Sequence, residues 1–144
     1  MSAPRPARIL IADDDRAFRV STTALLRQDG YHVTEVRDGQ AAIDASRGGG
    51  FDLLLLDLRM PRRDGLGVVE QLRSEGEGLP ILMLSGFGTP EVALRALQLG
   101  ADDFLIKPFE PDVLAAHVHE ILQRRECLRR RDNDLAPEIR GGAS

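Results

Sequence analysis

The distribution of apolar residues along the chain predicts five short strands that alternate with five helices. Apolar, β-prone runs occur at 8–12, 31–36, 53–57, 81–84 and 104–106. Between and after these runs, apolar residues recur at helical spacing within 18–30, 40–46, 66–72 and 90–100, and from 111 onward. An alternating order of this kind requires a parallel sheet with right-handed crossovers and with helices on both faces.

The third run is the most apolar. Four consecutive leucines, 53–56, show no alternation, which predicts a strand covered on both faces and too short to span a membrane. The run ends at Asp57, and Met60-Pro61 and Asp64-Gly65 then form the turn into the next helix. Asp57 is therefore expected at the carboxyl edge of the sheet, where open α/β folds bind ligands. A capping or turn aspartate is the alternative interpretation.

Size and composition are those of one ordinary globular domain. The chain has 144 residues, of which 42% are hydrophobic and 29% charged. No apolar run approaches the roughly 20 residues of a spanning helix, and the first residues lack the apolar centre of a secretory signal, so a cytoplasmic location is expected. Cys127 is the single cysteine, and we interpret it as structurally incidental.

The charged residues narrow the function. A net charge of −4 argues against a nucleic-acid surface over the whole domain. All but one of the 19 basic residues are arginine, and the exception is Lys107. A compact ammonium group meets a phosphoryl oxygen differently from a planar guanidinium, so Lys107 is a candidate for chemistry, with chance retention as the alternative.

Polar side chains follow four of the five predicted strands. Asp13 and Asp14 follow the first strand, Asp57 the third, Ser85 the fourth and Lys107 the last. Because carboxyl ends of parallel strands share one edge of a sheet, these side chains are expected to converge.

Three carboxylates at one edge repel each other, by roughly 4 kcal/mol per pair at about 4 Å and an effective dielectric near 20. A bound divalent cation relieves the repulsion, and oxygen ligands favour Mg²⁺ (or Mn²⁺), whereas zinc favours histidine and cysteine. Protonation of one carboxylate is the alternative. A metal, a carboxylate, a hydroxyl and an ammonium around one point fit an aspartyl phosphate.

The segments that carry this set resemble the receiver domain of two-component response regulators. The matching pieces are 9–15, Asp57–Pro61 with Asp64-Gly65, 84–86 and 100–109, within a resemblance that covers about 7–123. The resemblance implies a flavodoxin-like, doubly wound five-stranded parallel sheet in the order 2-1-3-4-5. Residues 1–6 are then a flexible lead, and 124–144 a helical extension or linker, partly disordered.

The resemblance also implies a role for each acidic residue. Asp57 matches the phosphoacceptor, which takes its phosphoryl group from the phosphohistidine of a sensor histidine kinase or a phosphotransfer protein. Asp14 matches the direct metal ligand and Asp13 the ligand that acts largely through water. The carboxylate of Asp57 itself and the backbone carbonyl of Arg59 would complete the protein ligands.

The remaining site residues follow from the same resemblance. Ser85 matches the switch hydroxyl, Lys107 the cation that contacts the phosphoryl group, and Phe104 the aromatic whose rotamer follows the switch. Gly86 would leave room for the phosphoryl oxygens. Arg59 and Phe87 occupy variable positions that influence how long the phosphoryl group lasts. Ser85 replaces the commoner threonine, and Phe104 lacks the hydroxyl of the tyrosine often found there.

The implied function is that of a switch rather than an enzyme that turns over a free substrate. Phosphorylation would shift the face of the fourth helix, last strand and fifth helix, through which the chain could also form a homodimer. One alternative is a Mg²⁺-dependent phosphatase with Asp57 as nucleophile, although Arg59 occupies the position where such enzymes commonly carry an acid/base carboxylate. The other is a dimerisation module that is never phosphorylated.

The tail after residue 123 allows two interpretations. Leu114, Ile121, Leu128 and Leu135 are seven residues apart, which permits the last helix to continue toward a linker or a dimer seam. The run 129–131 is all arginine and could contact nucleic acid, but a mixed-charge run is more often a solvated helix face. We expect this segment neither to bind nucleic acid directly nor to enter a membrane.

Overall fold

The computed structural model describes the backbone of residues 5–86 and 88–143, and side chains in those ranges up to residue 128. The strands are β1 (Arg8–Ala12), β2 (His32–Val36), β3 (Leu53–Asp57), β4 (Ile81–Ser85) and β5 (Asp103–Ile106). The helices are α1 (Arg16–Gln28), α2 (Gly39–Arg47), α3 (Gly65–Ser74), α4 (Pro90–Leu99) and α5 (Pro111–Ala143). All neighbouring strands pair in parallel in the order β2-β1-β3-β4-β5, so the predicted fold and strand order are confirmed.

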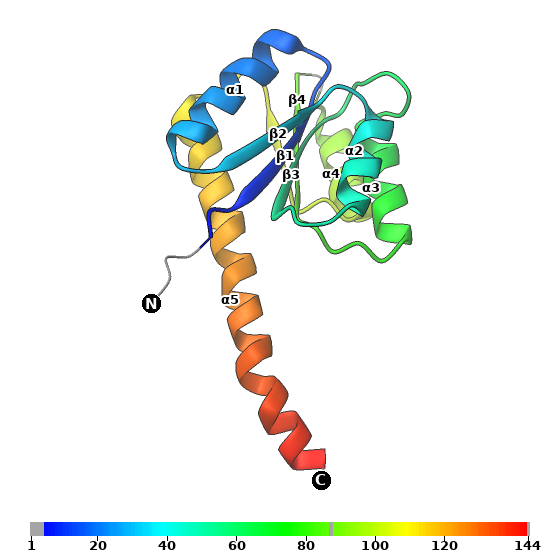
Figure 1. Ribbon diagram of the computed structural model, residues 1–144. Coiled ribbons are helices and arrows are strands. Elements are labelled where there is room, and N and C mark those ends of the chain that lie inside the picture. Colours follow the sequence, from blue (N-terminus) through cyan, green and yellow to red (C-terminus); the bar gives the residue numbers. More distant parts are fainter. Residues whose placement is uncertain (1–4, 87, 144) are drawn as a thin grey trace.

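The sheet is the middle layer of three. In Figure 1, α1 and α5 cover one face of it, and α2, α3 and α4 cover the other. The leucines of β3 serve both faces in turn, because successive side chains of a strand point in opposite directions. Leu53 and Leu55 join the core beneath α1 and α5, whereas Leu54 and Leu56 join the core beneath α2, α3 and α4. Burial on both faces explains why this strand has no polar alternation.

The edge strands are less buried than the central ones. Every residue of β3 and β4 is buried, but β2 alternates and β5 is only partly buried. This difference follows from the strand order, since β2 and β5 each have a neighbour on one side only.

Helix caps gather at the carboxyl end of the sheet. The side chains of Asp15, Asp38, Asp64 and Thr89 each accept a hydrogen bond from a backbone N–H in the first turn of α1, α2, α3 and α4. A capping side chain satisfies one of the free N–H groups at a helix start and fixes where the helix begins. The four helices therefore begin beside the strand ends that carry the candidate residues.

The last helix is longer than the body it packs on. Ile121 is its last residue buried in the core, whereas Leu128 is 59% exposed. The backbone of α5 continues to Ala143 and extends past the sheet in Figure 1. The side chains of Leu135 and of the arginines at 129–131 lie outside the described residues. Among the helices of the described chain, none has both the length and the apolar character needed to cross a bilayer.

Candidate functional site

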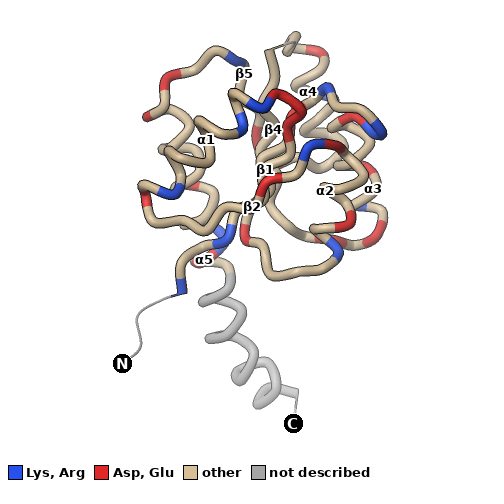
Figure 2. The backbone as a smooth tube through the Cα atoms, turned by 45° about the horizontal axis from the view of Figure 1, so that its top comes forward, with Lys and Arg blue, Asp and Glu red and all other residues tan. Residues whose placement is uncertain are grey.

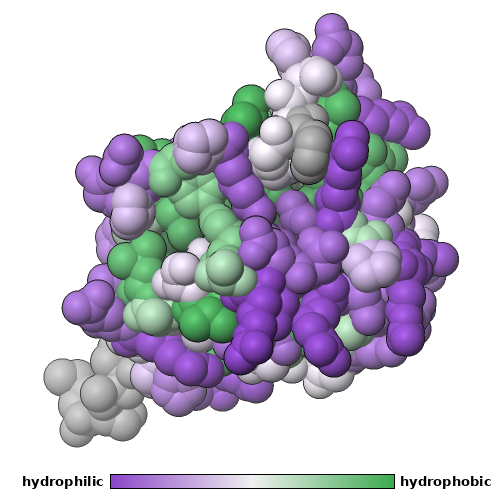
Figure 3. All heavy atoms as spheres, turned by 90° about the horizontal axis from the view of Figure 1, so that it is seen from above, coloured by the Kyte–Doolittle hydropathy of each residue, from purple (hydrophilic) through white to green (hydrophobic). Residues whose placement is uncertain are grey.

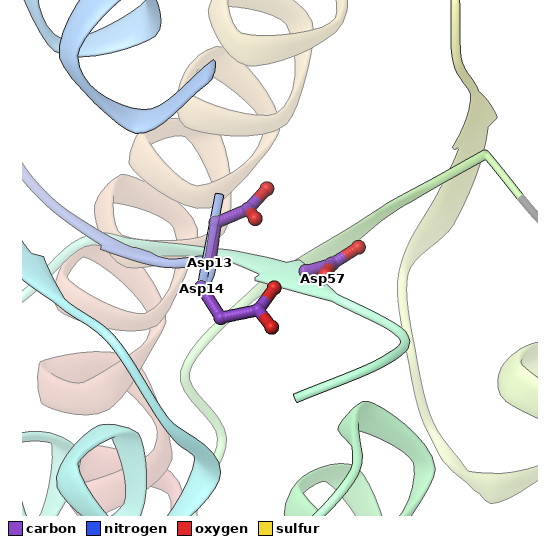
Figure 4. A group of neighbouring side chains, drawn as sticks. All are labelled: Asp13, Asp14 and Asp57. Atoms are coloured by element: carbon purple, nitrogen blue, oxygen red, sulfur yellow. The ribbon is translucent and has the colours of Figure 1, made fainter. Parts of the chain in front are cut away.

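Three carboxylates meet at the carboxyl edge of the sheet. Asp13 and Asp14 directly follow β1, and Asp57 ends the neighbouring strand β3, whose Leu56 pairs with Ala12. One oxygen from each carboxylate lies within 4.8 Å of the others, and Figure 4 shows the side chains directed to the same side. Within the part of the chain that the structure describes, this is the one group of histidine, cysteine and acidic side chains close enough to share an ion.

Burial disfavours the charged form of two of these three carboxylates. Asp13 and Asp57 are 1% and 8% exposed, whereas Asp14 is exposed. Burial, and then the neighbouring charge of Asp13, raise the pKa of Asp57 to about 6, with Lys107 opposing the shift and Asp14 adding to it. A nearby positive charge would therefore stabilise the ionised form of Asp57.

Lys107 supplies one such charge. It follows β5, and its Nζ donates a hydrogen bond to Asp13 Oδ2 at 2.8 Å and lies 3.7 Å from Asp57 Oδ1. Its backbone N–H donates to the carbonyl of Ser85 at 2.8 Å, which holds the end of β5 beside the end of β4. The predicted convergence of the aspartates and the lysine is therefore seen in the structure.

The donor set fits Mg²⁺ or Mn²⁺. These ions take oxygen ligands and keep several waters, and the exposed side of Asp14 gives water access to the carboxylates. Burial and then the charge of Asp13 raise the pKa of Asp57, so a cation at this point would stabilise its ionised form. Lys107 alone bonds only Asp13 closely, which leaves the charge of Asp57 partly uncompensated.

Ser85 and Gly86 lie next to this group. Ser85 is fully buried as the last residue of β4, whose Leu84 pairs with Asp57. Gly86 is exposed, and a Cβ built on it would meet no atom within 4 Å, so the space beside the strand end is open. Ser85 is therefore a buried residue on the strand next to Asp57, and Gly86 leaves open space directly after it.

The remaining predicted site residues are Phe104, Arg59 and Phe87. Phe104 is half-buried and packs against the core beneath α4 rather than against the carboxylates. Its ring leaves no room at Gly88, where a Cβ would lie 2.7 Å from it. Arg59 is exposed in the loop after β3, and Phe87 lies outside the described residues.

Gly65 closes the loop that follows Asp57. Its N–H donates to the carbonyl of Leu58 at 2.7 Å, so the first turn of α3 folds back onto the strand end. A Cβ at this position would lie 2.4 Å from the carbonyl oxygen of Asp57 and 2.8 Å from Met83 Cε. Only glycine fits so close to the backbone of the candidate acceptor.

Two contacts at this site have no counterpart in the sequence-based prediction. Arg19 is 8% exposed, and its guanidinium donates to the backbone carbonyl of Asp13 at 2.8 Å and to Glu35 Oε1 at 3.0 Å. The ring of Phe18 lies against Lys107. The available signal for Arg19 was its phase, since it shares the buried stripe of α1 with Thr22 and Leu26.

The surroundings are polar with apolar residues on one side. Acidic and basic stretches of the chain lie next to each other at this end in Figure 2. Seen from above in Figure 3, hydrophilic residues fill the middle of the face, and hydrophobic residues gather on one side of it. A charged ligand can therefore reach the carboxylates from solvent.

Comparison with known proteins agrees with this geometry. Residues 9–119 match the family described as the response regulator receiver domain. The chain is 44% identical over 119 residues to the response regulator MprA of Mycolicibacterium vanbaalenii, an alignment that covers 83% of this chain and 52% of that protein. The chain thus spans about half the length of the curated relatives it matches.

Solved structures show the same fold. The receiver domain of the Francisella response regulator 1452 is similar with a TM-score of 0.80 and 28% identity, over 83% of this chain and 98% of that one. A CheY-like response regulator receiver domain protein from Methanospirillum hungatei is similar with a TM-score of 0.80 and 30% identity, over 85% and 98%.

Proposed function

Since this chain belongs to the response regulator receiver family, we propose that it is a phosphorylation-dependent switch in which Asp57 accepts the phosphoryl group. The donor would be the phosphohistidine of a sensor histidine kinase or of a phosphotransfer protein. The observation that carries the proposal is the cluster of Asp13, Asp14 and Asp57, whose carboxylates lie together beside the Lys107 ammonium.

The transfer itself is a displacement at phosphorus. An Asp57 Oδ attacks, the new O–P bond forms, and the P–N bond to histidine breaks, with the electron pair and a proton left on the imidazole. Asp14, Asp57 and the Arg59 carbonyl would hold Mg²⁺ (or Mn²⁺), and Asp13 would act on the ion largely through water. The ion would supply charge neutralisation for the phosphoryl oxygens.

Residues around Asp57 would then respond to its phosphorylation. The Ser85 hydroxyl would donate to one phosphoryl oxygen, Lys107 would contact another, and Gly86 would leave the space they occupy. Phe104 would follow Ser85 inward, so that the face of α4, β5 and α5 changes its population. As support, large apolar residues stand exposed on these elements, namely Leu94, Leu97, Ile106 and Val113.

We propose this face as the contact to an output domain, a partner or a second copy of the chain. The receiver domain would occupy 7–123, with 124–144 as its linker, in a cytoplasmic protein that regulates an output such as transcription. The lifetime of the phosphoryl group would depend on Arg59 and Phe87. The activity would be that of a switch that modifies itself, not of an enzyme with a free substrate.

The test is phosphorylation by a small donor. Incubation with acetyl phosphate and Mg²⁺ should add the mass of one phosphoryl group, and chelation of the metal should prevent it. Asp57→Asn should remove the added mass. Asp52→Asn, at the opposite end of the same strand, is the matched control and should keep it. Labelling that persists in Asp57→Asn would refute the assignment.

The same samples distinguish the alternatives. Steady turnover of a phosphate ester would favour a phosphatase. The exposed Arg59, two residues after Asp57, argues against one, because such enzymes commonly carry an acid/base carboxylate at that position. A dimer with no phosphoryl incorporation under any metal condition would favour a module that is never phosphorylated.

A further inference from the structure

We propose that Phe18 is a positioning residue for Lys107, and that its ring holds the ammonium at the edge of the acidic pocket. The inference rests on the proposed function, because it concerns how the lysine reaches the phosphoryl group. Lys107 Nζ lies 3.7 Å from the centroid of the Phe18 ring, well within the distance of about 6 Å at which a cation is attracted to a ring face.

The ring is fixed independently of the lysine. Phe18 stands in the first turn of α1, where its backbone N–H donates to the capping side chain of Asp15 at 3.2 Å. Its ring packs with the core beneath α1 and α5 and meets Phe109 edge to face, at 6.0 Å between centroids and 85° between planes. The cap fixes the backbone of Phe18, and the contact with Phe109 orients its ring. Neither contact involves the lysine ammonium.

Among the residues that the structure describes, two carboxylates are the other close partners of the lysine, and the proposed reaction changes both. Nζ lies 2.8 Å from Asp13 Oδ2 and 3.7 Å from Asp57 Oδ1. Asp13 would be shared with the metal, and Asp57 would become the phosphorylated side chain. The Phe18 ring takes no part in these exchanges, so its contact with the ammonium can remain throughout.

This retained contact has a physical consequence. A lysine side chain has four rotatable bonds and loses conformational freedom when it is held in one place. Contact with the ring keeps the ammonium within reach of the pocket while its carboxylate partners change. Without the ring, the lysine would spend part of its time in solvent, and transfer would slow by about threefold to tenfold.

A purely apolar role for Phe18 makes a different prediction. If the ring only fills space between α1 and the loop after β5, leucine should serve as well as phenylalanine, and Lys107 should stay in place. If the ring attracts the ammonium, tyrosine should preserve the position of Lys107 and leucine should not. The pair Phe18→Leu and Phe18→Tyr therefore separates the two roles.

The sequence offers a direct readout. Lys107 is the only lysine, so protein made with ¹³C-labelled lysine gives one Cε–Hε signal by NMR. In the wild type this signal should lie upfield of free lysine, because protons over an aromatic face are shielded. Phe18→Tyr should keep the upfield position, and Phe18→Leu should lose it. Val20→Ala, at an exposed position of α1, is the control and should change neither signal nor rate.

The rate of labelling by acetyl phosphate at fixed pH and Mg²⁺ is the second readout. It should fall in Phe18→Leu and be restored in Phe18→Tyr. An unshifted wild-type signal, or a Phe18→Leu protein with wild-type signal and rate, would overturn the inference, and the wild-type signal decides even if Phe18→Leu does not fold. If instead Asp57→Asn still takes up the phosphoryl group, it is the proposed function that fails, while the NMR result for Phe18 stands.

Discussion

Asp52 and Asp57 flank the same strand, β3, at its two ends. At the amino end, Asp52 Oδ2 accepts a hydrogen bond from the backbone N–H of Arg8 at 2.8 Å. Asp102, beside the start of β4, likewise accepts from Ile81 at 2.7 Å. At the carboxyl end, Asp57 lies beside Asp13, and burial raises its pKa to about 6. Asp52 and Asp102 therefore satisfy N–H groups of neighbouring strands at the amino end, whereas Asp57 shares the carboxyl end with two other carboxylates.

The direction of the strands explains the difference. Parallel strands present free N–H groups at their amino ends and free carbonyls at their carboxyl ends. At the amino end a carboxylate can accept from a free strand N–H. At the carboxyl end the free groups of the strands are acceptors, and Asp57 also lies beside two other carboxylates, so its charge is stabilised by a nearby cation. The cavity of about 700 Å³ lined by Tyr31, Asp52 and Arg125 lies at the amino end. Unsatisfied charge, more than the size of a cavity, marks the functional end of this sheet.

The comparison predicts stability changes of opposite sign for two asparagine substitutions. The pKa of Asp57 rises from 3.8 to about 6 on folding, so its stabilising effect is full below pH 4 and is lost as the pH rises through 6. Asp57→Asn should therefore raise the free energy of unfolding at pH 7.5 by about 1–3 kcal/mol. Asp52→Asn should lower it by about 1 kcal/mol, because an uncharged acceptor binds the Arg8 N–H less strongly.

Urea unfolding of both variants without divalent metal measures these changes. Repeating it at pH 4 is the control, since the gain of Asp57→Asn should shrink toward zero once the wild-type carboxyl is protonated. A loss of stability in Asp57→Asn at pH 7.5 would contradict the electrostatic account of the carboxyl end.

Two glycines give a second contrast between the ends. Gly65→Ala should cost about 1–3 kcal/mol, because the new methyl group would press on the Asp57 carbonyl and on Met83. Gly78, just before β4 at the amino end, has nothing within 4 Å of an added Cβ. Gly78→Ala should leave the unfolding free energy unchanged or raise it by about 0.4–1 kcal/mol. Thermal unfolding of the pair tests this, and equal melting temperatures would show that the loop after Asp57 yields easily.

Two arginines give a third contrast, because each donates hydrogen bonds to backbone carbonyls at one end of the sheet. Arg19 donates to the carbonyl of Asp13, and Arg73 donates to the carbonyls of Gly100 and Glu77. Replacing either by methionine should cost about 1–2 kcal/mol, since buried acceptors lose their donor. Only Arg19→Met should also weaken Mg²⁺ binding, by about tenfold, because it releases the backbone of a metal ligand. Calorimetric titration with MgCl₂ measures this, and equal affinities in both variants would reduce Arg19 to a structural role.

Arg19 also shows how far the sequence could lead. The apolar runs determine the strands, and a strand's direction determines the end at which Asp57 lies, so the fold and the acidic cluster could be predicted. The partners of Arg19 and Phe18 could not be, because they depend on how α1 crosses the ends of β1 and β5. Periodicity shows which face of a helix is buried, but not which atom of another element that face meets. Among the arginines of the chain, Arg19 had only its phase to distinguish it as the one that bonds the backbone of the acidic cluster.

The smallest expected effect is that of the metal on the unmodified protein. At ten times its dissociation constant, Mg²⁺ should raise the unfolding free energy at pH 7.5 by about 1.4 kcal/mol. The increase should be smaller below pH 6, where protons compete for Asp57, whose pKa is about 6.

Asp52→Asn should keep this increase, and Asp57→Asn should lose most of it, because within the described part of the chain the carboxyl end is where carboxylate oxygens gather around one point. Unfolding in MgCl₂ and in NaCl of equal ionic strength separates a bound ion from general screening. If NaCl stabilises as well as MgCl₂, the charge at this end is relieved by screening alone. Mg²⁺ would then add nothing to the charge that Lys107 supplies, and the contrast between the two ends would reduce to the pKa of one carboxyl.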